Sequence, residues 1–191
     1  MPAPADIKGR RTREPFAERG RSDFDTRHVF TVSFVYQTPS RSNVVVRGWQ
    51  ISGAGSAYSG QPFTPQYSGP NADLGQATRP DRIASGAVAH PGPNGWFDLN
   101  AFVPVPDSAF RFGNSGRNIL DGPGSVAVNL ALSREFRIAE KNRFQLRWEG
   151  FNVTNHTNFQ LPNTTLDKNN AGTITGNKPA RIMQLGLKYQ F

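Results

Sequence analysis

The side chains that most often do chemistry in proteins are scarce and scattered in this chain. It has no cysteine and only three histidines, His28, His90 and His156, which lie far apart in the sequence. The lack of cysteine excludes disulfides and thiolate metal sites, and the histidines do not have the spacing of metal ligands. No serine–histidine–aspartate set and no carboxylate pair can be arranged as a catalytic site. We therefore expect no enzyme activity, no cofactor and no resident metal.

Polar side chains instead recur on one side of two alternating stretches near the C-terminus. Gln145, Arg147 and Glu149 alternate with apolar residues, and so do Gln184 and Lys188. Residues two apart share one face of a β-strand, so each stretch would have a polar face and an apolar face. We expect these five polar side chains to face the lumen of a pore. Long, two-faced strands are the elements that must position them.

Five stretches of the sequence alternate in this way, and they predict an all-β, antiparallel fold. They cover residues 27–37, 44–59, 126–138, 142–153 and 181–191. Strands of globular proteins mostly have about 5–6 residues, whereas about 9–11 residues cross a bilayer at a tilt. The length of the stretches therefore favours a segment of a transmembrane β-barrel over a compact sandwich.

Three residues interrupt the pattern of these stretches. Gly53 and Gly55 weaken the second predicted strand or mark a bend in it. Arg134 lies on the apolar side of the third strand, near its expected end.

The connections between the predicted strands alternate between short and long. Residues 38–43 and 139–141 form the short turns, whereas about 60–125 and 154–180 form the longer loops. Barrels of the outer membrane have short periplasmic turns and long extracellular loops, so the C-terminus is expected on the periplasmic side. The longest loop contains aromatic pieces at Phe63, 96–97 and 110–112, which we expect to fold back on one another or on the barrel mouth.

The composition suits such a wall better than a soluble core. Hydrophobic residues make up only 36% of the chain, yet it contains 14 phenylalanines, 19 glycines and 15 prolines. The net charge is +8, and several arginines and lysines fall within residues 1–26, which we interpret as a basic, solvated extension. The N-terminus has no apolar signal segment, so an outer-membrane protein of this sequence is expected to be incomplete there.

Three segments carry a resemblance to a known family. Residues 185–191 look like the outer-membrane assembly signal, in which alternating apolar residues end in a terminal aromatic residue; its members would be Leu185, Leu187, Tyr189 and Phe191. Residues 146–159 resemble the penultimate-strand segment of Oar-like TonB-dependent receptors, which often carry a carboxypeptidase-regulatory-like domain. Segments 24–30, 48–50 and 59–63 are similar to upstream strands of the same barrels.

The resemblance implies a location, a role and a set of partners. In that family a 22-stranded barrel encloses an N-terminal plug, and residues 27–191 would be its C-terminal strands. Such a piece, with the long loop at about 60–125, would not transport a substrate alone. Its expected partners are outer-membrane lipid, the barrel-assembly machinery, and the remaining strands and plug. TonB would be reached only through the missing N-terminal part, and no nucleic acid is expected. The implied location is the outer membrane of a Gram-negative type of cell.

Two alternatives from other classes remain open. The chain could be a soluble, secreted β-sandwich that binds carbohydrate on a platform of Trp49, Trp96, Trp148 and Tyr58. It could also be a basic nucleic-acid-binding protein that uses residues 8–21, although no recognisable nucleic-acid fold follows them.

Overall fold

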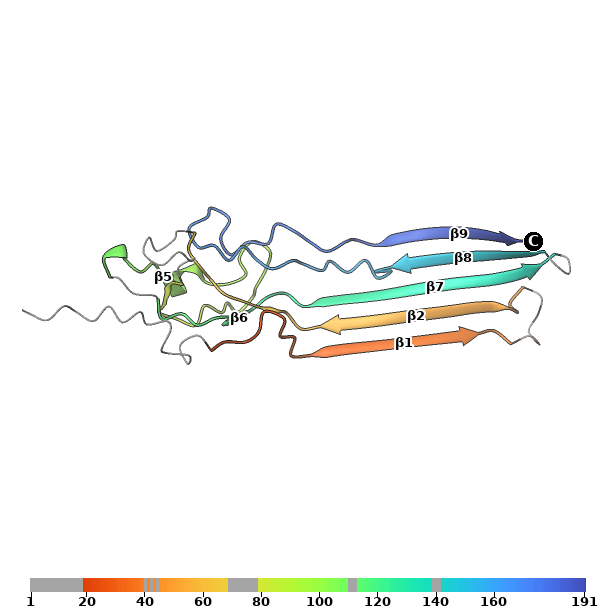
Figure 1. Cartoon of the computed structure of the whole chain (residues 1–191), viewed down its shortest axis with the longest axis horizontal. Coiled ribbons are helices and arrows are strands. Elements are labelled where there is room, and N and C mark those ends of the chain that lie inside the picture. The colour runs from red at the N-terminus through yellow and green to blue at the C-terminus, as the bar shows by residue number, and fades with distance from the viewer. Residues whose placement is uncertain are drawn as a thin grey trace, which may run out of the picture. The chain divides into compact units, whose positions relative to one another are not determined.

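Five long strands form one antiparallel sheet (Figure 1). The computed structural model describes residues 19–39, 41, 43, 45–68, 79–109, 113–138 and 142–191. The long strands are β1 (Val29–Gln37), β2 (Trp49–Tyr58), β7 (Ser125–Arg137), β8 (Arg143–Phe151) and β9 (Ile182–Gln190). Their order in the sheet is β1-β2-β7-β8-β9, and each pairs antiparallel with its neighbours. The predicted all-β, antiparallel fold is confirmed.

The observed strand ends lie within two residues of the predicted ones, with a single large difference. β2 begins at Trp49 instead of residue 44. Residues 45–48 form a turn instead, and Gly48 has a φ of 79°, a left-handed conformation that glycine adopts at little cost. The second short turn, at 139–141, lies outside the described residues.

Gly53 and Gly55 make room for neighbouring side chains and do not bend β2. They pair with Phe34 and Val32 of β1, and the pairing of β2 is continuous from Trp49 to Tyr58. A Cβ atom on Gly53 would lie 2.4 Å from Cε1 of Phe34. A larger residue at this position would therefore collide with the aromatic ring from the next strand.

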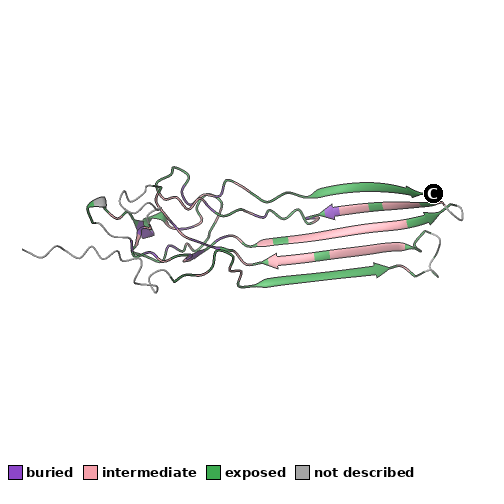
Figure 2. Ribbon diagram, in the orientation of Figure 1, coloured by how far each residue is buried: buried purple, intermediate pink, exposed green. Residues whose placement is uncertain are grey.

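The edge strands of the sheet are more exposed than the strands between them. Every residue of the edge strands β1 and β9 is exposed, whereas most residues of β2, β7 and β8 are half-buried (Figure 2). The outer sides of β1 and β9 pair with no other strand of the described chain, so this five-stranded sheet is open at both edges.

The chain divides into two compact units. The sheet unit comprises Thr26–Gly60, Pro123–Gln160 and Gly176–Phe191. The loop unit comprises the described residues of Met1–Asp25, Gln61–Gly122 and Leu161–Thr175. No helix in the described part of the chain is long and apolar enough to cross a membrane.

The loop unit is built from very short elements around a small core. It contains β3 (Pro62–Phe63), β4 (Asp81–Arg82), β5 (Phe102–Val103), β6 (Leu120–Asp121), and the single-turn 3-10 helices η1 (Leu99–Ala101) and η2 (Asp107–Ala109). β3 pairs with β6, and β4 pairs with β5. The expectation that aromatic pieces fold back on one another is confirmed for Phe63 and Phe97, whose ring centroids lie 5.4 Å apart. The aromatic piece at 110–112 and the basic residues 8–18 lie outside the described residues.

Candidate functional site

Cross-strand register gathers most of the large apolar residues of all five long strands onto one side of the sheet, which we call the apolar face. One row across the sheet consists of Tyr36, Ile51, Leu132, Trp148 and Leu185. Because side chains alternate along each strand, the rows two residues away along the strands lie on the same face. A shift of one residue in any strand would move its apolar set to the other side. Register therefore converts five alternating sequences into one two-faced wall.

The opposite side, which we call the polar face, contains all five residues predicted to face a lumen. Gln145 pairs with Lys188, and Glu149 pairs with Gln184. Nε of Arg147 donates to Oε1 of Glu149 at 2.9 Å, and Nε2 of Gln184 donates to Oε2 of Glu149 at 2.6 Å. The structure thus brings these side chains together, while their contact with a lumen stays a prediction.

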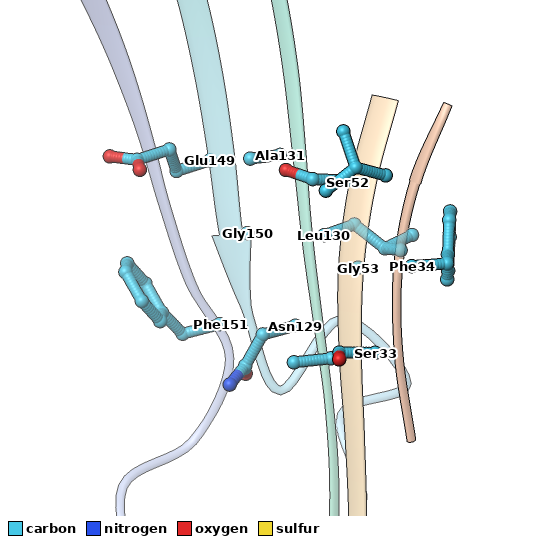
Figure 3. Close-up of a pocket in the computed structure, with 12 residues that line it drawn as sticks. Ser33, Phe34, Ser52, Gly53, Asn129, Leu130, Ala131, Glu149, Gly150 and Phe151 are labelled. Atoms are coloured by element: carbon cyan, nitrogen blue, oxygen red, sulfur yellow. The ribbon is translucent and has the colours of Figure 1, made fainter. Parts of the chain in front are cut away.

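A shallow hollow lies on the sheet and is lined in part by small residues (Figure 3). Ser33, Ser52 and Ala131 contribute to it, with Glu149 and Phe151 on its β8 side. Binding pockets for small molecules enclose most of the ligand, whereas this hollow is broad and open. Its lining is mostly apolar, and it lacks the enclosure of a ligand pocket.

The predicted assembly signal lies on the apolar face. Leu185, Leu187 and Tyr189 alternate along β9, and Leu185 and Leu187 are 72% and 69% exposed. Phe191 follows the strand and is 94% exposed. The ring of Tyr189 lies 4.7 Å from that of Phe144 and 5.9 Å from that of Phe191. The exposed apolar end is a suitable recognition element, and its role in assembly stays a prediction.

An asparagine-rich turn after β8 is a feature that sequence reasoning missed. The side chain of Asn158 accepts from the N–H of Val126 at 2.7 Å and donates to its carbonyl at 2.8 Å. The amide therefore pairs with β7 as the backbone of a neighbouring strand would. Asn152 has a φ of 48°, and its N–H donates to Oδ1 of Asn129. The repeated Asn at 152, 155 and 158 is the signal that could have predicted it, because asparagine favours such turns.

His156 belongs to this same turn. The ring Nδ1 of His156 lies 3.2 Å from Oδ1 of Asn158, and its backbone N–H donates to Oδ1 of Asn152. Within the described residues, no group of three or more His, Cys, Asp or Glu could hold a metal ion. The absence of a metal and of catalysis stays a prediction.

The aromatic residues of the alternative carbohydrate platform do not form one surface. Trp49 and Trp148 lie on the apolar face, whereas Tyr58 pairs with Ser125 on the polar face. Trp96 belongs to the loop unit.

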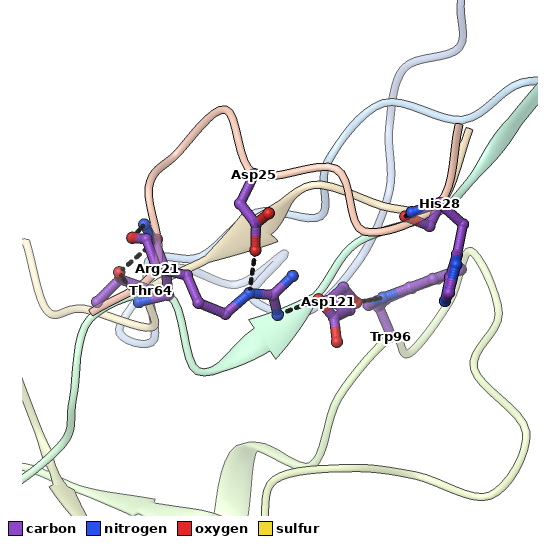
Figure 4. Close-up of polar contacts among 8 residues, drawn as sticks. Arg21, Asp25, His28, Thr64, Trp96 and Asp121 are labelled. Carbon is purple, nitrogen blue, oxygen red and sulfur yellow. Dashed lines mark hydrogen bonds and ion pairs between the residues drawn. The ribbon is translucent and has the colours of Figure 1, made fainter. Parts of the chain in front are cut away.

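Polar bonds fasten the segment before β1 to the rest of the loop unit (Figure 4). Nε of Arg21 donates to Oδ2 of Asp25 at 2.8 Å, and its Nη1 forms an ion pair with Asp121. The hydrogen bond to Asp25, followed by that to Asp121, raises the pKa of Arg21 above its ordinary value. The side chain of Asn118 donates to the carbonyl of Arg21 at 2.7 Å and to Asp23 at 2.6 Å.

Residues between β8 and β9 complete the loop unit. The N–H of Ser68 donates to Oδ1 of Asp167 at 2.9 Å, and the Ser68 hydroxyl donates to the other carboxylate oxygen. These bonds lower the pKa of Asp167 below its ordinary value. Burial, together with the charge of Asp167, raises the pKa of Tyr67. The N–H of Trp96 donates to the carbonyl of Gly172 at 2.8 Å, so three separate parts of the sequence form one unit.

The comparisons with known proteins agree with this architecture. The outer membrane beta barrel domain matches residues 5–184, which is most of the chain. The searches of curated proteins and of solved structures found no match. Long antiparallel strands with one apolar and one polar face are what a barrel wall in lipid requires. The chain therefore belongs to the outer membrane beta barrel domain family, and its place is the outer membrane.

Proposed function

We propose that this chain forms wall strands of an Oar-like TonB-dependent receptor and has no enzyme activity. The observation that carries the proposal is the continuous register of the two faces across all five long strands. The apolar face contacts lipid, and the polar face, with Arg147, Glu149 and Gln184, lines the lumen or contacts the plug. The resemblance of residues 146–159 to the penultimate-strand segment of these receptors supports the narrower assignment.

The connections support one orientation in the membrane. β1 is joined to β2, and β7 to β8, at the end of the sheet where β9 finishes (Figure 1). All chain connections to the loop unit leave from the opposite end. Barrels have short turns on the periplasmic side and long loops outside, so the C-terminus is periplasmic and the loop unit extracellular. We assign any contact with substrate to the loop unit, and within it to the long loop between β2 and β7.

The open edges support the need for further strands. Every backbone polar group in a bilayer must be hydrogen-bonded within the protein, so β1 and β9 require partners. The remaining barrel strands supply these partners, and the receptor's N-terminal part supplies the plug and the contact with TonB. Transport is therefore a property of the whole receptor. The barrel-assembly machinery recognises the apolar end of β9.

Single cysteines test the proposed wall, because this chain contains none of its own and any cysteine in the rest of the receptor can be replaced by serine. In cells that make the complete receptor, Asn169→Cys in the loop unit should react with a membrane-impermeant maleimide added outside. Arg47→Cys, in the turn between β1 and β2, should react only after the outer membrane is permeabilised. On β7, Val128→Cys should contact lipid and resist labelling, whereas Ala127→Cys, its neighbour on the polar face, should label.

Reversed labelling of Asn169→Cys and Arg47→Cys would overturn the orientation but keep the wall. Equal labelling of Val128→Cys and Ala127→Cys would overturn the wall itself. Recovery of the chain in the soluble fraction would support the soluble β-sandwich instead.

A further inference from the structure

One side chain breaks the separation of charge between the two faces. The long strands contain seven charged residues: Arg134, Glu135, Arg137, Arg143, Arg147, Glu149 and Lys188. Six of them lie on the polar face. Arg134 alone pairs with Trp49 and Leu146 on the apolar face. A charge facing lipid is costly unless it reaches the interface or a partner of opposite charge.

Arg134 is held in place by aromatic rings and a backbone carbonyl. Its guanidinium carbon lies 4.6 Å from the ring centre of Phe136 and 5.5 Å from that of Trp49. Nη1 of Arg134 donates to the carbonyl of Val45 at 2.7 Å, and Nε1 of Trp49 donates to the same carbonyl at 2.9 Å. The indole and the guanidinium are thus fixed side by side on the apolar face.

The surroundings of Arg134 have the chemistry of a membrane interface. It lies in the half of the sheet nearer the short turns, as do the aromatic rings of Phe144 and Tyr189. Val45 and Val46 are exposed apolar residues in the adjoining turn. Aromatic side chains collect at the two levels where a barrel meets lipid headgroups.

The turn next to Arg134 is cationic, which complements an anionic headgroup. Arg41 and Arg47 lie in this turn, whereas Arg137, Arg143, Lys188 and the acidic Glu135 lie near the same end on the polar face. The planar fork of a guanidinium presents its N–H donors in a geometry that matches phosphate oxygens.

We propose that Arg134 binds the phosphate of a phospholipid headgroup at the short-turn end of the apolar face, with Trp49 and Phe136 against the adjoining lipid. The inference rests on the proposed membrane wall and goes beyond it. A wall needs only an apolar surface, whereas this site adds a preference for phosphate at one level of the bilayer. The bound lipid would fix the height of β7 in the membrane.

The test measures headgroup preference next to Arg134. In the whole chain in maltoside micelles, Trp96→Phe and Trp148→Phe leave Trp49 as the remaining tryptophan. Its fluorescence is titrated with brominated-chain phosphatidylglycerol, and with brominated diacylglycerol, which has the same acyl chains and no phosphate. Phosphatidylglycerol should quench at about tenfold lower concentration, a usual effect of one charge-assisted contact. Arg134→Leu should abolish this ratio, and Arg134→Lys should reduce it because lysine lacks the planar fork.

Arg143→Leu is the matched control, because this cation lies near the same end on the polar face. It should keep the full ratio. The parent chain and Arg134→Leu must both first show a normal β-sheet circular dichroism spectrum. A ratio near one in the parent chain, or an unchanged ratio in Arg134→Leu, would then overturn the inference. Displacement of phosphatidylglycerol by equimolar inorganic phosphate would indicate a soluble-anion site and also overturn it. The cysteine labelling reports the wall independently: normal labelling with a ratio near one leaves the proposed function intact, and failed labelling overturns both.

Discussion

The two units of this chain treat their apolar residues in opposite ways. The buried hydrophobic residues of the described chain all lie in the loop unit: Phe63, Phe97, Ala101, Phe102, Leu120, Ala171 and Ile174. The long strands of the sheet unit bury none, and Phe30, Phe34, Leu185 and Leu187 are all exposed. The sheet unit has the regular alternation of a β-protein but no hydrophobic core among its described residues, whereas the loop unit, which consists of the connections, has one.

The difference identifies the solvent to which each unit is adapted. The loop unit removes apolar surface from water in the ordinary way, around rings that contact one another. The sheet unit is held by backbone ladders and presents its apolar face outward, which is favourable only where that face meets lipid. Mutations should therefore act through a packed core in one unit and through the membrane in the other.

The largest effect is expected from emptying the loop core. Phe97 is buried and contacts both Phe63 and Phe102, so Phe97→Ala should destabilise the loop unit by about 3–5 kcal/mol. Amide hydrogen exchange checks this loss of stability. The backbone N–H of Trp96, which donates to the carbonyl of Gly172, should lose protection while the backbone amides of β7 keep theirs. The control is Leu99→Ala, since Leu99 is already 39% exposed. Equal loss of protection in β7 would contradict the independence of the two units.

The next effect distinguishes the faces of the sheet. Leu130 on the apolar face and Ala131 on the polar face are adjacent in β7. Leu130→Arg should destabilise the sheet in phospholipid vesicles by about 2–4 kcal/mol, the cost of an arginine facing the middle of a bilayer. Ala131→Arg should cost little, because residue 131 pairs with Glu149. Denaturant unfolding of the receptor in vesicles measures both, and equal losses would show that the faces do not differ in solvent.

A smaller effect is expected at the turn after β8. Asn158→Leu removes both bonds to the backbone of Val126 and should cost about 1–3 kcal/mol, the usual penalty for unsatisfied polar groups. Asn158→Asp keeps the acceptor for the Val126 N–H, so its stability should lie between that of the parent chain and that of Asn158→Leu. Exchange of the Val126 amide is the measurement. Asn169→Leu, an exposed substitution in the loop unit, should leave it unchanged.

The difference between the two units also explains which features could be predicted from the sequence. Alternation with a period of two is a local signal, so the strands at 126–138 and 181–191 were located within one residue. The set predicted to face a lumen, including Gln145 and Gln184, shares one face because register follows from the same alternation. The start of β2 was placed too early, because the Val-rich segment before Gly48 looks like a strand and forms a turn.

Contacts between distant segments were beyond local pattern. The core that joins Phe63, Phe97 and Leu120, and the bonds from Arg21 to Asp121, connect residues whose spacing has no period. The same holds for the placement of Arg134 between Trp49 and Phe136. Its position on the apolar side was visible in the sequence, but the aromatic neighbours and the Val45 carbonyl depend on how the turn folds.

The smallest effect is a titration within the loop unit. The two hydrogen bonds from Ser68 stabilise the charged carboxylate of Asp167 and lower its pKa below 3.8, the ordinary value. A lowered pKa in the folded state means that the unfolded chain takes up the proton first as pH falls. The contribution to stability is therefore complete above the ordinary value and is lost as pH falls through the lower, folded one. The Ser68 amide resonance should accordingly titrate with a midpoint below 3.8, and Asp167→Asn should abolish that titration. A midpoint at or above the ordinary value would mean that Ser68 does not hold the carboxylate, and that the residues between β8 and β9 are held in the loop unit by their other contacts, such as the backbone bond from Trp96 to Gly172 and the packing of Leu166.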